Sequence, residues 1–363
     1  MKKLHKTQAA LNLPTLKLEG ALFLPDQLGK AALGGAKWQT EADYLTPKGL
    51  KLKDDYSRAF QIASAQYKHF AAQLDRTDVD AVPLTQNLVQ ELLRDAFGYT
   101  NLAPVKSITV GERNYPVQFL AGSLPIIVAP HTLGLDEADA CFAITGSGSR
   151  KKSAFQLAQE LLNASSEHLW AIVSNGKQLR LLRDAATLTR PSFLEVDLQD
   201  LLDGQRYAEF ANVWRLLHAS RAGNDPQSCI WERWREAGQE EGTRVRDGLR
   251  LGVTQALLTL GEGFLQHPDN EALRRVLHDG ELSKDGYFQQ LLRLIYRLIF
   301  LFSVEERGLL HPADEKKEAI AARRAYSEGY AVARLRELCL KRRARNRFDD
   351  HWQALRIVFN GLS

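Results

Sequence analysis

The sequence has little cysteine and no long uninterrupted hydrophobic run. Its 363 residues include only Cys141, Cys229 and Cys339, which lie far apart. This number and spacing exclude a disulfide framework and give no metal-ligand motif, so we expect reduced thiols in a cytosolic protein. The most apolar stretch, residues 291–302, contains two arginines and is too short to cross a bilayer.

The sequence also lacks a secretory signal and a strong excess of either charge. The basic start of the chain is not followed by an apolar segment, so we expect a soluble cytoplasmic protein without a membrane partner. The net charge is only +4, whereas compact nucleic-acid-binding domains are often strongly basic. Any basic surface must therefore be local.

The hydrophobic share of 44% is enough to build cores, and the length predicts two or three domains. We place an N-terminal module at residues 1–77. Within it, residues 54–74 carry apolar side chains every three or four positions, which predicts a helix.

Residues 78–200 are predicted to form a small α/β domain. Thr85 is a plausible N-cap for a helix that ends at Gly98. Strands are expected at residues 107–110, 115–120 and 125–128, and the continuous apolar run of the last is typical of a strand buried on both faces. A second helix is expected at residues 154–163.

The clearest local signal is a hairpin. Residues 169–173 and 178–182 are apolar runs that flank Ser-Asn-Gly-Lys, and Asn-Gly tolerates the positive φ angles of a tight turn. Residues 193–196 could add one more strand.

From Leu201 onward the strand signal vanishes, so residues 201–363 are predicted to be helical. Helices are expected at residues 207–217, 244–260, 283–302 and 323–343. The chain stops at Ser363 directly after an apolar helical stretch, and we expect it to be part of a longer protein.

Three segments together resemble a known family. They are LLRLIYRLIFLFSVEERGLL (residues 291–310), LWAIVSNGKQLRLLRD (169–184) and YLTPKGLKL (44–52). In their order along the chain, 44–52, 169–184 and 291–310, they resemble the N-terminal regions of large type IIG restriction–modification enzymes and of defence-island adenine-specific DNA methyltransferases, including those of DISARM and BREX systems. Among these, the DISARM-type enzymes are the best match.

The resemblance implies an α+β protein, with a PD-(D/E)xK nuclease-like α/β domain followed by an all-helical region. Such a nuclease needs an acid on one strand and an acid-x-lysine on the next, because the carboxylates hold Mg²⁺. The first candidate strand, residues 115–119, has no acid, and Ala129 and His131 replace the acid and the lysine. Only Glu91 could match an additional helical acid. We therefore expect a degenerate nuclease fold.

The methyltransferase motifs of the family are also missing. The chain has no glycine-rich loop after a strand for S-adenosylmethionine and no Asn-Pro-Pro-Tyr-like motif for a flipped adenine. The resemblance places them in a domain downstream of residue 363. We therefore assign no catalytic residue, metal ligand or cofactor to this chain, and expect S-adenosylmethionine only in the full-length enzyme.

Two basic clusters are candidates for contact with double-stranded DNA. One follows a Gly-Ser-Gly-Ser turn, and the other lies in the basic run of residues 334–347. The alternative is that each cluster is only a solvent-exposed charged surface without a DNA contact. The predicted DNA-binding residues are Arg150, Lys151, Lys152, Lys341, Arg342, Arg343, Arg345 and Arg347.

Two other groups have ordinary explanations that we prefer. His131 has three acidic residues close behind it, but no spacing fixes three metal ligands together, so a histidine at a strand end is favoured. Trp214, Trp231, Trp234 and Trp352 could stack on bases, but tryptophans at helical spacing are usually core or interface anchors. The 291–302 stripe is interpreted as packing.

The leading hypothesis is a non-catalytic module that binds or positions DNA for an adenine-N6 methyltransferase. One alternative is a divergent Mg²⁺ nuclease whose carboxylates have migrated, for instance Glu91 with Asp136, Glu137 or Asp139. Another is a scaffold for a second defence subunit, such as a helicase. Two carboxylates close together beside a lysine would favour the nuclease, and an exposed apolar patch would favour the scaffold.

Overall fold

The computed structural model describes residues 13–76, 78–146, 151–184, 192–223, 225–227, 229–311, 316–341 and 348–362. The chain divides into two compact units, residues 8–243 and residues 244–363 together with 1–7. We call them the α/β unit and the helical unit, and describe each by itself. The sequence predicts boundaries at 77/78 and 200/201. In the structure the units meet at 243/244, because strands and helices from both ends of residues 8–243 share one sheet and its cores.

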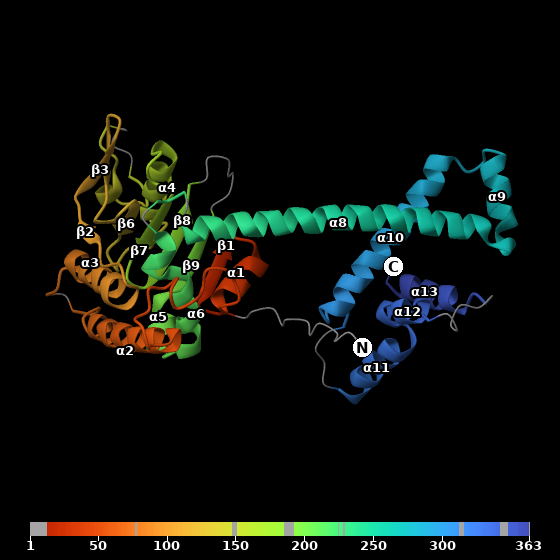
Figure 1. Cartoon of the computed structure of the whole chain (residues 1–363), viewed down its shortest axis with the longest axis horizontal. Coiled ribbons are helices and arrows are strands. Elements are labelled where there is room, and N and C mark those ends of the chain that lie inside the picture. Colours follow the sequence, from red (N-terminus) through yellow and green to blue (C-terminus); the bar gives the residue numbers. More distant parts are fainter. Residues whose placement is uncertain are drawn as a thin grey trace. The chain divides into compact units, whose positions relative to one another are not determined.

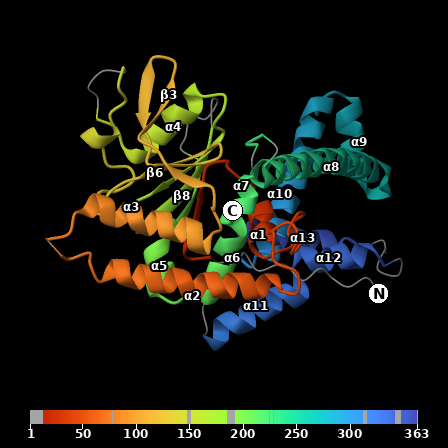
Figure 2. The same cartoon turned by 60° about the vertical axis from the view of Figure 1, so that its left-hand side comes forward.

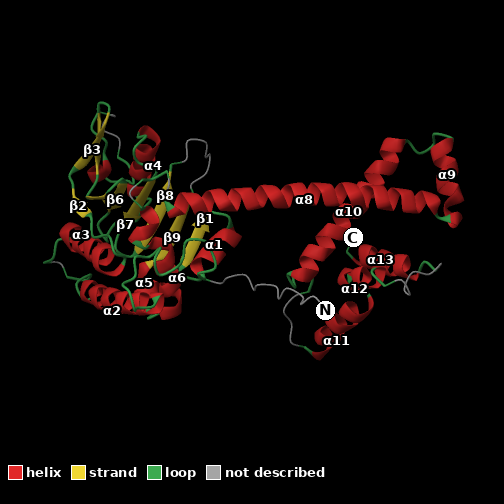
Figure 3. Cartoon of the chain, in the orientation of Figure 1, coloured by secondary structure: helices red, strands yellow, loops and turns green. Residues whose placement is uncertain are grey.

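A seven-stranded mixed sheet organises the α/β unit, in the order β1-β9-β8-β7-β6-β5-β2 (Figure 3). Neighbouring strands are antiparallel except for β6 and β7, which are parallel and are connected through helix α4. The strands are β1 (Leu16–Glu19), β2 (Leu102–Pro104), β5 (Phe119–Ala121), β6 (Leu124–Val128), β7 (Trp170–Ser174), β8 (Gln178–Arg183) and β9 (Phe193–Asp197). A separate two-stranded sheet consists of β3 (Ser107–Val110) and β4 (Arg113–Pro116).

The central strands are apolar on both faces because both faces are covered. In β6 and β7, Ile126 and Ile172 belong to one core, whereas Ile127 and Val173 belong to the other. The first core also contains side chains of α1, α2, α3, α5 and α6, and the second contains those of α4 and of the β3–β4 hairpin (Figure 2). The helices are α1 (Pro25–Ala32), α2 (Leu52–Ala71), α3 (Ala81–Glu91) with a π-helical turn (Leu92–Ala96), α4 (Ala154–Ala164), α5 (Leu198–Asp203), α6 (Tyr207–Leu217) and α7 (Ala219–Ala222).

Most of the local predictions for this unit are confirmed. The Asn-Gly turn joins β7 and β8, and β6 is a fully buried strand. Helix α4 begins after Ser153, whose hydroxyl accepts a hydrogen bond from the backbone N–H of Gln156. The α/β unit is thus a mixed sheet covered by helices, and the coarse α+β assignment is correct.

Two predictions for this unit are wrong. The single strand expected at residues 115–120 is split between β4 and β5, which belong to different sheets, because the chain changes sheet at Val117 and Gln118. The N-cap of α3 is Asp80, whose carboxylate accepts from the N–H of Val82. Thr85 is instead fully buried inside the helix.

The helical unit contains no strand among its described residues (Figure 1). Helix α8 (Ile230–Gln266) begins in the α/β unit and ends in the helical unit. It is followed by a 3-10 turn (Pro268–Asn270), α9 (Glu271–His278), α10 (Lys284–Glu306), α11 (Lys317–Gly329), α12 (Val332–Cys339) and α13 (Asp350–Gly361). The core is small and consists of Leu301, Val332, Leu355 and Val358 with partly buried neighbours.

The helix predicted at residues 323–343 is wrong, because α11 and α12 are separate helices. The chain turns at Tyr330 and Ala331, and the carboxylate of Glu305 on α10 accepts hydrogen bonds from the N–H groups of Val332 and Ala333 at 2.8 and 2.9 Å. A carboxylate at this place stabilises a new helix start. No helix of the described part of the chain is long and apolar enough to span a membrane.

Candidate functional site

The ends of β5 and β6 are where the resemblance would place a nuclease site. The two strands are adjacent and antiparallel. At the start of β5, the side-chain oxygen of Gln118 accepts a hydrogen bond from the N–H of Val128 at 2.7 Å, so it joins the two strands. At the end of β6, Ala129 is fully buried and its N–H binds the carbonyl of Ser174 on β7. The second acid position thus holds a buried methyl group, and Gln118 in the first candidate strand binds backbone.

His131, at the position that the motif gives to a lysine, is a packed side chain. It is 8% exposed, its N–H donates to the hydroxyl of Thr85 at 3.0 Å, and its ring meets Phe70 edge-on. Burial and, to a smaller extent, the positive charge of Lys177 lower the pKa of His131, so the imidazole is neutral at pH 7. A neutral, enclosed imidazole anchors the loop after β6 to α3 and supplies no cation.

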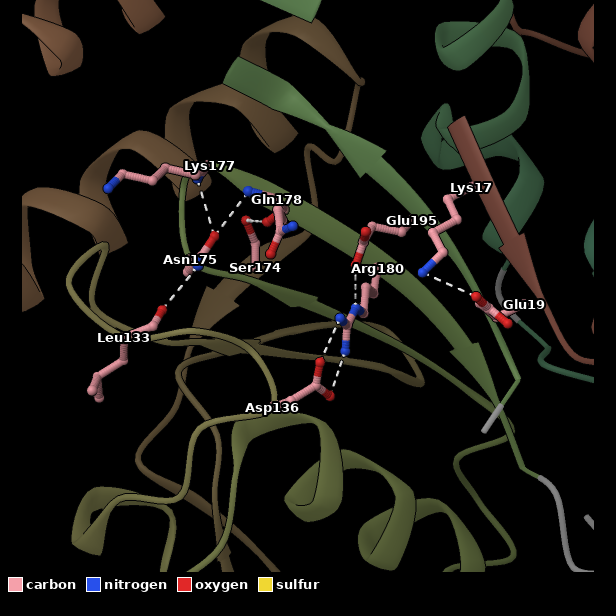
Figure 4. Close-up of polar contacts among 10 residues, drawn as sticks. All are labelled: Lys17, Glu19, Leu133, Asp136, Ser174, Asn175, Lys177, Gln178, Arg180 and Glu195. Carbon is pink, nitrogen blue, oxygen red and sulfur yellow. Dashed lines mark hydrogen bonds and ion pairs between the residues drawn. The ribbon is translucent and has the colours of Figure 1, made fainter. Parts of the chain in front are cut away.

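The Asn-Gly turn beside His131 is buried as well. The carboxamide oxygen of Asn175 accepts from the N–H groups of Lys177 and Gln178, while its nitrogen donates to the carbonyl of Leu133 (Figure 4). A Cβ on Gly176 would lie 2.9 Å from Cζ of Phe70 and 3.2 Å from Cγ2 of Thr85. Glycine is therefore required here for close packing against α2 and α3 as well as for the positive φ of the turn.

Arg180 on β8 binds two carboxylates from different segments. Its guanidinium binds both carboxylate oxygens of Asp136 at 2.7 Å and one of Glu195 at 2.5 Å, and lies over the ring of Phe193 at 4.3 Å (Figure 4). The hydrogen bonds from Arg180 hold the pKa of Asp136 below its usual range. Lys17 on β1 is nearby, but its amine pairs with Glu19 at 2.9 Å.

This cluster bears directly on the nuclease alternative. Asp136 and Glu195 both bind Arg180, and Lys17 is nearby, so two carboxylates come close beside a lysine, but the guanidinium lies between them. A guanidinium in that position takes the place a divalent cation would need. The cluster therefore fixes the loop after β6 to β8 and β9.

The other acids named for a migrated site have local structural roles. Glu137 accepts from the N–H of Gly134, Asp139 accepts from the N–H of Cys141, and Glu91 is exposed on α3. Within the described ranges, no group of three or more His, Cys, Asp or Glu side chains is arranged to hold a metal ion. Of the acids named for a migrated site, Asp136 is bound by Arg180, and Glu137 and Asp139 are bound by backbone N–H groups.

The predicted DNA-binding residues are only partly within the described chain. Lys151 is exposed, whereas the amine of Lys152 forms an ion pair with Glu160 on α4. Lys341 is exposed just after α12. The others, Arg150, Arg342, Arg343, Arg345 and Arg347, lie outside the described residues. Their contact with DNA stays a prediction.

A pocket in the helical unit was not found from the sequence. It encloses about 570 Å³ between α8, α10 and α13. Three arginines line it, Arg293 and Arg297 from α10 and Arg356 from α13, together with four aromatic side chains. These are Phe264, Tyr287, Trp352 and Phe359. The four-residue spacings of Arg293 with Arg297 and of Trp352 with Arg356 each place two side chains on one helix face. Nothing in the sequence, however, brings α10 to α13.

The tryptophans of the α/β unit and of the helical unit differ in exposure. Trp214, Trp231 and Trp234 are 3%, 1% and 1% exposed in the α/β unit, as expected for packing anchors. Trp352 is 40% exposed at the pocket, where its ring meets that of Phe264 edge-on at 5.9 Å. The packing interpretation is therefore confirmed for three of the four.

Charge is divided unequally between the two units. Residues 8–243 contain 24 Lys and Arg against 28 Asp and Glu, a net charge of −4, whereas residues 244–363 contain 21 against 16, a net charge of +5. Residues 1–7, which are grouped with the helical unit, add three lysines and bring the net charge of that unit to +8. Any attraction for a polyanion therefore comes mainly from the helical unit. The small overall charge conceals this division.

Comparison of the chain with protein-family models, curated proteins and solved structures finds no match.

Proposed function

We propose that this chain is a non-catalytic DNA-binding and positioning part of a bacterial adenine-specific DNA methyltransferase of a restriction–modification or phage-defence system. The observation that carries the proposal is the division of charge. A net +5 on residues 244–363, including the basic run, gives one unit the electrostatic character that phosphate contacts need. The methyltransferase itself, with its S-adenosylmethionine, is implied by the resemblance alone, and such a function belongs in the cytoplasm.

We further propose that the α/β unit is a degenerate nuclease-like domain. Two observations support it: β5 and β6, the strands that would share the metal site, are direct neighbours, and Ala129 and His131 fill the positions of the second acid and the lysine with groups that pack or bind backbone. On this proposal the unit serves as a rigid support.

The test is binding of the full chain to a labelled DNA duplex, followed by fluorescence anisotropy over a salt series with Mg²⁺, with the DNA then run on a gel. We expect binding that weakens steeply with salt, and intact DNA. Each lost phosphate contact makes the negative slope of log K against log salt shallower by about 0.9. Lys341→Gln and Lys151→Gln test one residue of each predicted cluster, and Lys48→Gln, at an exposed lysine outside both clusters, is the matched control.

The outcomes separate the three functions. Cleavage that EDTA stops would establish the nuclease alternative instead. Absence of binding even at low salt would contradict the DNA-binding proposal and favour the scaffold.

One observation favours the scaffold as a second candidate. Phe288, Tyr296 and Phe300 on α10 are 46%, 60% and 58% exposed. Exposed aromatic side chains on one helix are typical of protein interfaces. A second subunit of a defence complex would be the partner, and Tyr296→Ser with Phe300→Ser should then release it without changing DNA affinity.

A further inference from the structure

The pocket between α8, α10 and α13 differs from the charged clusters of the α/β unit because none of the described residues that line it is acidic. Arg180, Arg183 and Arg206 in the α/β unit each bind carboxylates. In the pocket, no described lining residue is acidic. The electrostatic repulsion among its three arginines is therefore not relieved by carboxylates of the pocket wall.

Each of the three arginines lies close to neutral groups. Arg297 lies over the ring of Phe359 at 5.4 Å, and Arg356 donates only a long hydrogen bond of 3.4 Å to the amide oxygen of Gln353. For Arg293 no ion pair is found among the described residues. Three guanidinium groups around one hollow attract an anion strongly, and the planar fork of arginine suits two oxygens of a phosphate.

The remaining wall is aromatic and amide-rich. Trp352 is 40% exposed and stands against Phe264, whereas the hydroxyl of Tyr287 is occupied by the carbonyl of Gly261 at 2.9 Å. An exposed indole offers a face for stacking on a planar ring, and the carboxamide of Gln290 on the same wall can read the edge of a base. The volume of about 570 Å³ lies in the range of pockets for small organic ligands.

We propose that this pocket binds an unpaired nucleotide, with its phosphate on Arg293, Arg297 and Arg356 and its base against Trp352. A bare inorganic anion would leave the aromatic wall unused, and an uncharged aromatic compound would leave the arginines without a counter-charge. Duplex DNA keeps its bases stacked inside, so the pocket favours single-stranded over double-stranded DNA. This inference deepens the proposed function and rests on it, because single-stranded DNA is the expected source of the nucleotide.

The test compares a labelled single-stranded 20-mer with the matching duplex, using the full chain and fluorescence anisotropy. Trp352→Leu should weaken single-strand binding about five-fold or more, since stacking on one aromatic ring contributes at least that much. Duplex affinity should be unchanged. Phe300→Leu removes an exposed aromatic ring on α10 outside the pocket and should change neither.

The arginines are tested by the salt dependence of the same binding. Arg297→Gln should make the slope of log K against log salt shallower by about 0.7 for the single strand, the value for one lost phosphate contact. Arg275→Gln, an exposed arginine on α9, removes the same charge away from the pocket and should leave the slope unchanged. Trp352→Tyr retains a stacking ring and should restore most of the affinity lost in Trp352→Leu, which separates loss of stacking from loss of folding.

Competition with ATP distinguishes the two sources of a nucleotide. Displacement of the 20-mer by micromolar ATP would support the pocket and make a free nucleoside phosphate its ligand, whereas displacement only by unlabelled single strand would support DNA as the source. Unchanged single-strand affinity in Trp352→Leu and in Arg297→Gln would overturn the inference. If the duplex is not bound at all while the single strand is bound through Trp352, the proposed duplex contact fails and the pocket stands.

Discussion

At Gly176 the backbone φ is +78°, and the space where a side chain would begin is filled by Phe70 and Thr85. Gly176→Ala should therefore destabilise the α/β unit by about 3 kcal/mol, the sum of a left-handed backbone and an overpacked neighbour. Urea unfolding followed by tryptophan fluorescence measures this. Gly111→Ala is the control, because Gly111 also has a positive φ but nothing lies within 4 Å of its Cβ position, and it should lose only about 1 kcal/mol.

His218 gives a pH dependence to the same unit. Burial, and then the charge of Arg221, lower its pKa to about 4, while an unfolded histidine titrates near 6.5. A lowered folded pKa means that the stability from the neutral imidazole is present above pH 6.5 and is lost as the pH falls toward 4. We expect the free energy of unfolding to decrease over that range.

The matched variant for this prediction is His218→Asn. Its side-chain oxygen can still accept the hydrogen bond that the N–H of Ser220 donates to Nδ1 of His218, but it does not titrate. The free energy of unfolding of the variant should change less than that of the wild type between pH 6.5 and 4. Equal pH dependence in both proteins would contradict the assignment.

Single residues were the least predictable level from sequence. The Asn-Gly turn was recognised because its signal is local. The contact between Thr85 and His131 joins residues 46 positions apart, so the local sequence predicts a helix cap at Thr85 and gives no sign of this contact. The pocket could not be predicted for the same reason. Its arginines belong to two helices, and they meet only because α10 packs near α13.

Among the elements, the start of α12 depends most clearly on a side chain from elsewhere in the chain. Glu305 on α10 accepts from two N–H groups of α12 and from the hydroxyl of Tyr326 on α11 at 2.6 Å. Glu305→Ala should destabilise the helical unit by about 2 kcal/mol, the range for hydrogen bonds to a charged group. Circular dichroism at 222 nm during urea unfolding measures it, and Glu306→Ala, at the exposed neighbour, should have little effect.

This contact also explains which elements sequence could predict. The strands β6 to β8 carry their signals in their own residues, in apolar runs and a tight turn, and the sequence predicts them and helix α4. The sequence predicts one continuous helix at residues 323–343, whereas the structure has two. The break is stabilised by Glu305, which precedes that segment and so does not contribute to its helical pattern. For the same reason the split between β4 and β5 was missed, since only the partner strands distinguish them.

For the whole molecule, the two units differ in the size of their cores. The α/β unit has two extensive cores, whereas four buried residues form the core of the helical unit. The helical unit should therefore unfold at lower urea concentration. The buried tryptophans Trp170, Trp214, Trp231 and Trp234 all report on the α/β unit, while circular dichroism reports on both.

We therefore expect the circular dichroism signal to begin its transition at lower urea than the fluorescence signal. Two coincident transitions would show that the chain unfolds as one cooperative block and would contradict independent units. At this scale the mixed α+β class and the helical C-terminal region followed from the sequence, while the boundary at 243/244 did not, because α8 continues through it without a break in helical pattern.

The position of β1 has a consequence for how the protein is made. This strand pairs with β9, so Leu16 lies opposite Val196, and Phe23 just beyond it stacks on Trp170. At the usual rate of translation, on the order of ten seconds or more pass between the synthesis of the two partners. Throughout that interval β1 has no strand to pair with. The nascent chain must keep this unpaired strand, with the apolar side chains of Leu16 and Leu18, from aggregating until the strand that pairs with it has left the ribosome.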